Sequence, residues 1–272
     1  MLGKYFRWNA AISIPVLLLG IQARAEPIYD NGPPNRAGGS ASEMTHWIQA
    51  DDFTLPAGGR LKSVKFWAYE GSGTFHGSIL WQIYANADSN TPGALLESGS
   101  SANLSHVATG FDYFGYPEFE TTFDIAPVSL PAGMYWIALH NGPLSNNTNQ
   151  GRVYWGTTGN AGAVPSRGLK APFDGSWFSH AFPGYFSEFA FELSGVPGAR
   201  VTAFTTEDGV PQITFTTTAG QYYRVEYKNN LTDAMWTAVR DRESVPGTGN
   251  TVQVSDPDVG NPTHRLYRVV LL

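Results

Sequence analysis

The chain has 272 residues, of which 42% are hydrophobic and 15% are charged, and it contains no cysteine. The lack of cysteine excludes disulfide frameworks, thiolate zinc sites and thiol catalysis. Acidic residues outnumber basic ones by 23 to 17, for a net charge of −6, and such a chain is a poor partner for nucleic acid or for an anionic membrane surface.

Residues 1–25 have the pattern of a secretory signal peptide. Lys4 and Arg7 precede an apolar run centred on residues 17–19, and Ala23-Arg24-Ala25 supplies a small-x-small cleavage site. The apolar run is too short for the roughly 20 residues of a membrane-spanning helix. We therefore expect a secreted protein, in the periplasm, at the cell surface or in the medium, with no transmembrane segment after signal removal.

The segments after residue 25 alternate apolar and polar side chains, as strands with one buried face do. Residues 56–59 and 131–133, rich in proline and glycine, are predicted turns between such strands. The pattern predicts an all-β fold, with an antiparallel, jelly-roll-like β-sandwich over residues 26–195. In chain order, the predicted inward stripes are Val64, Phe66 and Ala68; Ile79, Trp81 and Ile83; Tyr135, Ile137 and Leu139; and Phe189, Phe191 and Leu193.

A second, smaller β-sandwich-like module is predicted at residues 199–272, after a linker around residues 195–198. Within it, Tyr223, Val225 and Tyr227 are expected to face a core, and the alternate residues, Glu226 among them, to face water. Trp236 is the strongest single core candidate in this module. The predicted strands are residues 212–217, 222–228, 236–240, 251–255 and 266–271.

Several motifs of the larger module resemble a bacterial family. The segments are IYDNGP at 28–33, ADDFTLP at 50–56, the strand at 61–67, WQIYA at 81–85 and PGALL at 92–96. Their order is similar to that in choice-of-anchor-type secreted β-sandwich domains, and the resemblance covers residues 26–195. It implies a noncatalytic accessory sandwich of an exported bacterial protein.

The C-terminal region departs from that family pattern. In many relatives the passage FELSGVP, here residues 191–197, precedes a short sorting tail of the PEP-CTERM kind. Here residues 222–271 instead resemble a small β module found at the C-termini of bacterial exported proteins. This difference argues against anchoring by a C-terminal tail.

The search for catalytic motifs leaves one enzyme alternative. Glu118 and Glu120 lie two residues apart on one predicted strand face, and a pair of carboxyl groups is what glycoside hydrolysis requires. The same spacing also describes a solvated strand face. Because the chain has neither a Gly-x-Ser-x-Gly elbow nor a His-Glu-x-x-His motif, we expect a protein that is not an enzyme, with a polysaccharide hydrolase as the alternative.

Metal sites are predicted only weakly. The six histidines are isolated in sequence, without the spacing of zinc ligands. Structural calcium is possible at three oxygen-rich clusters, although Asx turns explain each of them equally well. The clusters are Asp30-Asn31, Asp51-Asp52, and Asp256-Pro257-Asp258 with Asn261. No other cofactor is predicted.

Carbohydrate is the first ligand to consider. Sugar rings rest on aromatic planes while amides and carboxylates hold their hydroxyls, and the glycine-rich region 141–185 has that composition. The candidate contacts are Trp177, Trp155, Tyr185, Asp174 and Asn147. The alternative is that the tryptophans pack the core. The predicted function is thus a structural, adhesive or carbohydrate-binding role outside the cytoplasm, with a purely structural envelope component as a further alternative.

Overall fold

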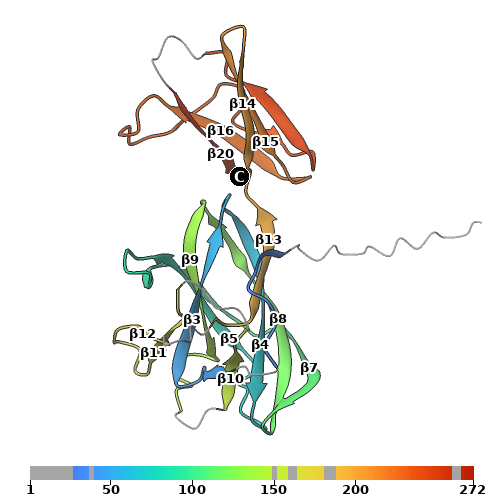
Figure 1. The fold of residues 1–272 in the computed structure, drawn as a ribbon, viewed down its shortest axis with the longest axis vertical. Coiled ribbons are helices and arrows are strands. Elements are labelled where there is room, and N and C mark those ends of the chain that lie inside the picture. Colours follow the sequence, from blue (N-terminus) through green and yellow to red (C-terminus); the bar gives the residue numbers. More distant parts are fainter. Residues whose placement is uncertain (1–26, 37–39, 149–151, 159–163, 181–187, 259–264) are drawn as a thin grey trace, which may run out of the picture.

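The computed structural model describes residues 27–36, 40–148, 152–158, 164–180, 188–258 and 265–272 (Figure 1). The all-β prediction is confirmed: these residues form antiparallel sheets and contain no helix. Consequently, no helix long and apolar enough to cross a membrane occurs in the described ranges. The predicted signal peptide at 1–25 lies outside them.

The larger module consists of two packed sheets. The first has seven strands: β1 (Pro27–Asp30), β2 (Ala41–Glu43), β4 (Gly59–Glu70), β7 (Leu104–Tyr113), β8 (Tyr116–Leu130), β10 (Val153–Gly156) and β13 (Phe191–Pro197). The second has six: β3 (Trp47–Leu55), β5 (Ile79–Asn86), β6 (Pro92–Ser101), β9 (Gly133–Asn141), β11 (Arg167–Lys170) and β12 (Phe178–Ser179).

Strand β4 organises the seven-stranded sheet. Along one edge it pairs first with β13 and then, through residues 68–70, with β10. Along the other edge it pairs with β8, which also pairs with β7. The predicted turn at residues 56–59 connects β3 to β4 and has Gly58 at a φ of +69°, a conformation that glycine adopts without steric cost.

All four predicted inward stripes meet in one hydrophobic core between the two sheets. Phe66 from β4 and Ile137 from β9 are both fully buried there. Burial of each such side chain stabilises the fold by about 1.5–3 kcal/mol. The period-two pattern therefore identified the inner faces of both sheets.

The smaller module has a core of its own, between a sheet of three strands and one of four. Ile213 and Phe215 come from the first sheet, and Tyr223 and Val225 from the second. The strands are β14 (Val201–Glu207), β15 (Val210–Thr216) and β19 (Thr251–Ser255); and β16 (Tyr222–Lys228), β17 (Thr237–Ala238), β18 (Val245–Pro246) and β20 (Leu266–Leu271).

Three details of the sequence prediction are wrong. Residues 195–197 are not linker, because β13 extends to Pro197 and pairs there with Gly59 of β4. Glu226 does not face water: it is 5% exposed and is paired with Arg224 and Arg268. Trp236 lies outside the core, where its ring packs between the cations of Lys228 and Arg268, 4.9 and 4.5 Å from the ring centre.

Candidate functional site

An aromatic pocket of about 300 Å³ opens on the seven-stranded sheet. It lies at the Tyr69 end of β4, whereas Gly59 at the other end of this strand lies beside residues 198–201. Strands β2, β4 and β10 and the β7–β8 hairpin contribute to it. The residues that line it are Ser40, Ala41, Tyr69, Tyr113, Phe114, Tyr116 and Tyr154.

The floor and walls of the pocket are tyrosines placed by strand register. Tyr69 on β4 pairs with Tyr154 on β10, and Tyr113 pairs with Tyr116 across the hairpin. The Tyr69 ring is stacked on Tyr113 at 5.0 Å, and Tyr116 meets Tyr154 edge-on at 5.4 Å. These contacts hold the rings in fixed orientations, so the pocket exists before any ligand arrives.

The rim carries an exposed ring on a strained turn. Phe114 and Gly115 form the two-residue loop between β7 and β8, with φ values of +52° and +85°. Positive φ at both positions is what a type I′ hairpin requires, and asparagine or aspartate is the favoured first residue. A bulky side chain in this backbone conformation is strained. Phe114 is 87% exposed, so burial of its ring does little to offset that strain. Strain of this kind is concentrated at binding sites.

Glu118, which contacts Tyr69, is fully buried and forms an ion pair with the half-exposed side chain of Arg36. Arg36 donates to both oxygens of Glu118, at 2.5 and 3.3 Å, and Thr109 donates to Oε1 at 2.7 Å. Burial, together with the adjacent Glu118, raises the pKa of Tyr69. Its phenol is therefore neutral at physiological pH and is hydrogen-bonded to Glu118.

This arrangement bears on the hydrolase alternative. Of the two carboxylates proposed for hydrolysis, Glu118 is fully buried and is held by Arg36 and Thr109. A general acid must reach the glycosidic oxygen of its substrate. Glu118 is fully buried in this structure and does not reach the surface.

Four of the five sequence-predicted ligand contacts lie in the described residues, and they differ in exposure. Trp155 is fully buried in the core of the larger module, where its Nε1 donates to the carbonyl of Ala190 at 2.9 Å, so no ligand reaches its ring. Trp177 is partly buried beside the six-stranded sheet, edge-on to Tyr84. Asp174 and Asn147 are exposed, and Tyr185 lies outside the described residues.

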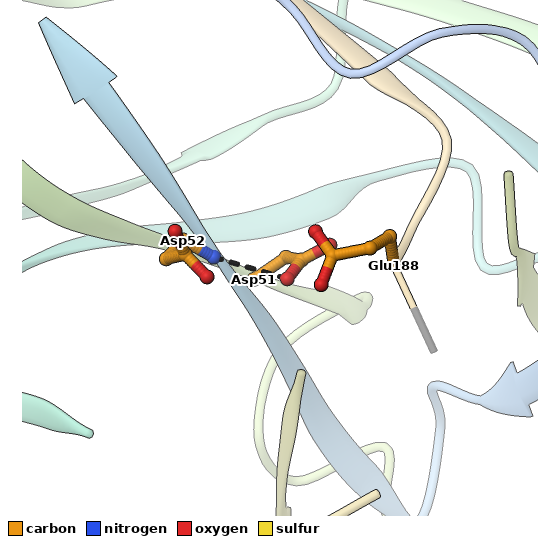
Figure 2. A group of neighbouring side chains, drawn as sticks. All are labelled: Asp51, Asp52 and Glu188. Carbon is orange, nitrogen blue, oxygen red and sulfur yellow. Dashed lines mark hydrogen bonds between the residues drawn. The ribbon is translucent and has the colours of Figure 1, made fainter. Parts of the chain in front are cut away.

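The oxygen-rich clusters have different outcomes. Asp256 is buried but is paired with Arg265 at 2.6 Å and with the Tyr267 hydroxyl at 2.7 Å, so its charge is already compensated. Asn261 lies outside the described residues. The Asn31 side chain, in contrast, donates to both Asp51 and Glu188. The carboxylates of Asp51, Asp52 and Glu188 lie close together (Figure 2).

Sequence reasoning missed the aromatic pocket and the position of Glu188 beside Asp51. The one local signal for the pocket is the segment Tyr113-Phe114-Gly115-Tyr116, in which a phenylalanine occupies the turn position that favours asparagine. The remaining tyrosines come from strands far apart in the chain. No single stretch of sequence contains the site.

Comparisons with known proteins identify no relative. No protein-family model, no curated protein and no solved structure matches the chain. The resemblance to choice-of-anchor-type domains therefore stays a prediction, and the case for a function rests on the geometry of the sites.

Proposed function

We propose that the protein acts outside the cytoplasm as a noncatalytic binding protein, and that its larger module binds carbohydrate in the aromatic pocket. The observation that carries this proposal is Phe114, an exposed ring held at a strained turn on the rim of a preformed tyrosine pocket. The signal-peptide pattern of residues 1–25 supports the location.

The chemistry of the pocket favours a sugar ring. The apolar C–H face of a pyranose packs against aromatic planes, and Tyr113 and Phe114 present two of them at the rim. The lining also includes the hydroxyls of Ser40 and Tyr116, which already contact Thr157 and Tyr154. Because a hydroxyl both donates and accepts hydrogen bonds, each can share a further bond with a sugar hydroxyl. A volume of about 300 Å³ is at the lower end of the range for ligand pockets and suits a short saccharide or a chain end.

A glycan array with residues 26–272 tests the proposal, followed by calorimetry on the best ligand. Phe114→Asn is the decisive variant, because asparagine tolerates the left-handed conformation while removing the ring. Leu231→Asn is the matched control: it removes an equally exposed apolar side chain, 79% exposed, from the smaller module.

We expect selective binding that weakens at least tenfold in Phe114→Asn and is unchanged in Leu231→Asn. If Trp177→Ala loses glycan binding and Phe114→Asn does not, the ligand binds in the glycine-rich region 141–185 that the sequence favoured. Absence of binding to any glycan would leave the structural envelope role, and release of sugar ends from a polymer would favour the hydrolase.

A further inference from the structure

Asp51 occupies a position where the strand pattern places an apolar side chain. On β3 it has the same parity as Phe53 and Leu55, which lie in the core between the two sheets. Asp51 is fully buried. A carboxylate on the inner face of a sandwich is costly unless its charge is compensated.

Two backbone amides hold the Asp51 carboxylate in place. Its Oδ1 accepts from the amide of Asp52 at 3.1 Å, and its Oδ2 accepts from the amide of Phe189 at 2.5 Å. Phe189 belongs to the segment that enters β13 of the opposite sheet. The Asn31 side chain, which follows β1, donates to Oδ2 at 3.4 Å and to the Phe189 carbonyl at 2.9 Å. Three distant parts of the chain thus converge on this carboxylate.

Glu188 points its carboxylate at that of Asp51 (Figure 2). It is 4% exposed, and its Oε2 accepts only a long 3.4 Å bond from Asn31 among the interactions seen at that atom. Its Oε1 is buried and has no hydrogen-bond partner in the described structure. A buried, unpaired carboxylate oxygen calls for a partner that the described protein atoms do not supply.

The charges nearest to Asp51 are negative. Burial, followed by repulsion from Glu188, raises its pKa well above the usual range. Burial and repulsion from Asp52 raise the pKa of Glu188 to about 7, and burial raises that of Asp52 to about 6 despite the attraction of Arg167. A single shared proton compensates two carboxyl groups but not three, whereas a divalent cation is attracted by all three.

We propose that Asp51, Asp52 and Glu188 bind one calcium ion, which ties β3 of the six-stranded sheet to the segment entering β13 of the other sheet. One oxygen from each residue lies within 4.8 Å of the others. Two oxygens bound to one calcium ion are at most two bond lengths apart, about 4.6–5.2 Å, so the three oxygens are near enough to one another to share an ion of this size. Calcium also accepts irregular coordination, whereas magnesium demands near-ideal octahedral geometry.

The test uses chelator-treated protein of residues 26–272, titrated with calcium chloride or magnesium chloride in a calorimeter and in thermal unfolding. Asp51→Asn and Glu188→Gln keep the shape of the side chains and remove their charge. Glu97→Gln, on exposed β6 of the same module, is the matched control.

We expect one calcium ion per chain and a rise in Tm of about 5–10 °C at a hundredfold excess over Kd. The rise should be smaller with magnesium, absent in Glu188→Gln and retained in Glu97→Gln. If Asp51→Asn fails to fold, Glu188→Gln alone decides, because its side chain carries no bond to the backbone among those described.

Two results would overturn the proposal. One is a wild-type protein that shows no heat of binding and no change in Tm with millimolar calcium. This would indicate that the carboxyl groups share a proton in place of the ion. The other is a calcium response of equal size in wild type and in Glu188→Gln. The variant Phe114→Asn, which is expected to weaken glycan binding, should keep the full rise in Tm with calcium. The calcium test is therefore independent of the proposed function.

Discussion

Replacement of Phe114 by asparagine separates binding from folding, because the structure assigns this ring almost no role in stability. Phe114 is 87% exposed, and a side chain of its type has about 150–250 Å², so only roughly 20–30 Å² of it is buried. At about 25 cal/mol per Å², that burial is worth about 0.5–0.8 kcal/mol. The edge-on contact with Tyr113 adds about 0.5 kcal/mol.

Relief of backbone strain at the turn offsets the stability that is lost with the ring. A left-handed residue with a Cβ costs about 1–2 kcal/mol, and asparagine avoids part of that cost. If the relief is about 1 kcal/mol, the two effects nearly cancel. We therefore expect Phe114→Asn to change the free energy of unfolding by no more than about 0.5 kcal/mol.

Urea unfolding of wild type and variant measures this difference directly. Tyr69→Ala, in the same pocket but only 2% exposed, is the positive control and should cost about 3 kcal/mol or more. A loss above about 1.5 kcal/mol in Phe114→Asn would refute the reasoning, because the ring would then be a structural element of the hairpin.

The other expectations concern buried and stacked aromatic groups. Trp155→Ala should cost about 3–5 kcal/mol in urea unfolding, since the ring is fully buried; a loss below 1 kcal/mol would contradict its place in the core. Trp236→Ala should cost only about 1–2 kcal/mol, the value of two cation–π contacts, and salt should reduce the difference from wild type. Burial lowers the pKa of His140 in the folded protein. As the pH drops below about 6.5, the usual pKa of histidine, His140 is therefore protonated in the unfolded chain before it is protonated in the folded one. The free energy of unfolding falls as a result. His140→Gln should remove up to about 1.4 kcal/mol per pH unit of that dependence, and equal slopes in wild type and variant would contradict the assignment.

The alternation of apolar and polar residues predicted much of the fold. Alternation along a strand is a property of neighbouring residues, and so the stripes through Phe66, Trp81, Ile137 and Phe191 were correctly placed in one core. The same rule failed for Glu226, because its burial depends on Arg268, which lies on another strand. The expectation that Trp236 is buried came from its aromatic ring and failed because that ring contacts Lys228 and Arg268 outside the core.

The candidate sites were less accessible to sequence reasoning. The carboxylates at Asp51 and Asp52 were recognised as an oxygen-rich cluster, but their third partner, Glu188, lies in a segment that only the sheet packing brings near. The strand pattern does contain one signal for this site: Asp51 lies on the same face of its strand as the buried Phe53, where an apolar residue is expected. The tyrosine pocket depends on the register of β4 with β10 and β8, which no local pattern specifies.

The pairing of β1 with β13 has a consequence for how the chain assembles. Pro27 lies opposite Ser194, and Asp30 opposite Glu192, so the first described strand finds its neighbour only after nearly the whole larger module has left the ribosome. Contacts between such distant residues form slowly, and at about 5–20 residues per second the wait during synthesis alone is roughly 8–30 seconds. Throughout that interval β1 has no partner strand, and the edge of β4 that pairs with β13 is unpaired. The part of the seven-stranded sheet that contains β1 and β13 is therefore the last part of the larger module that can form during synthesis.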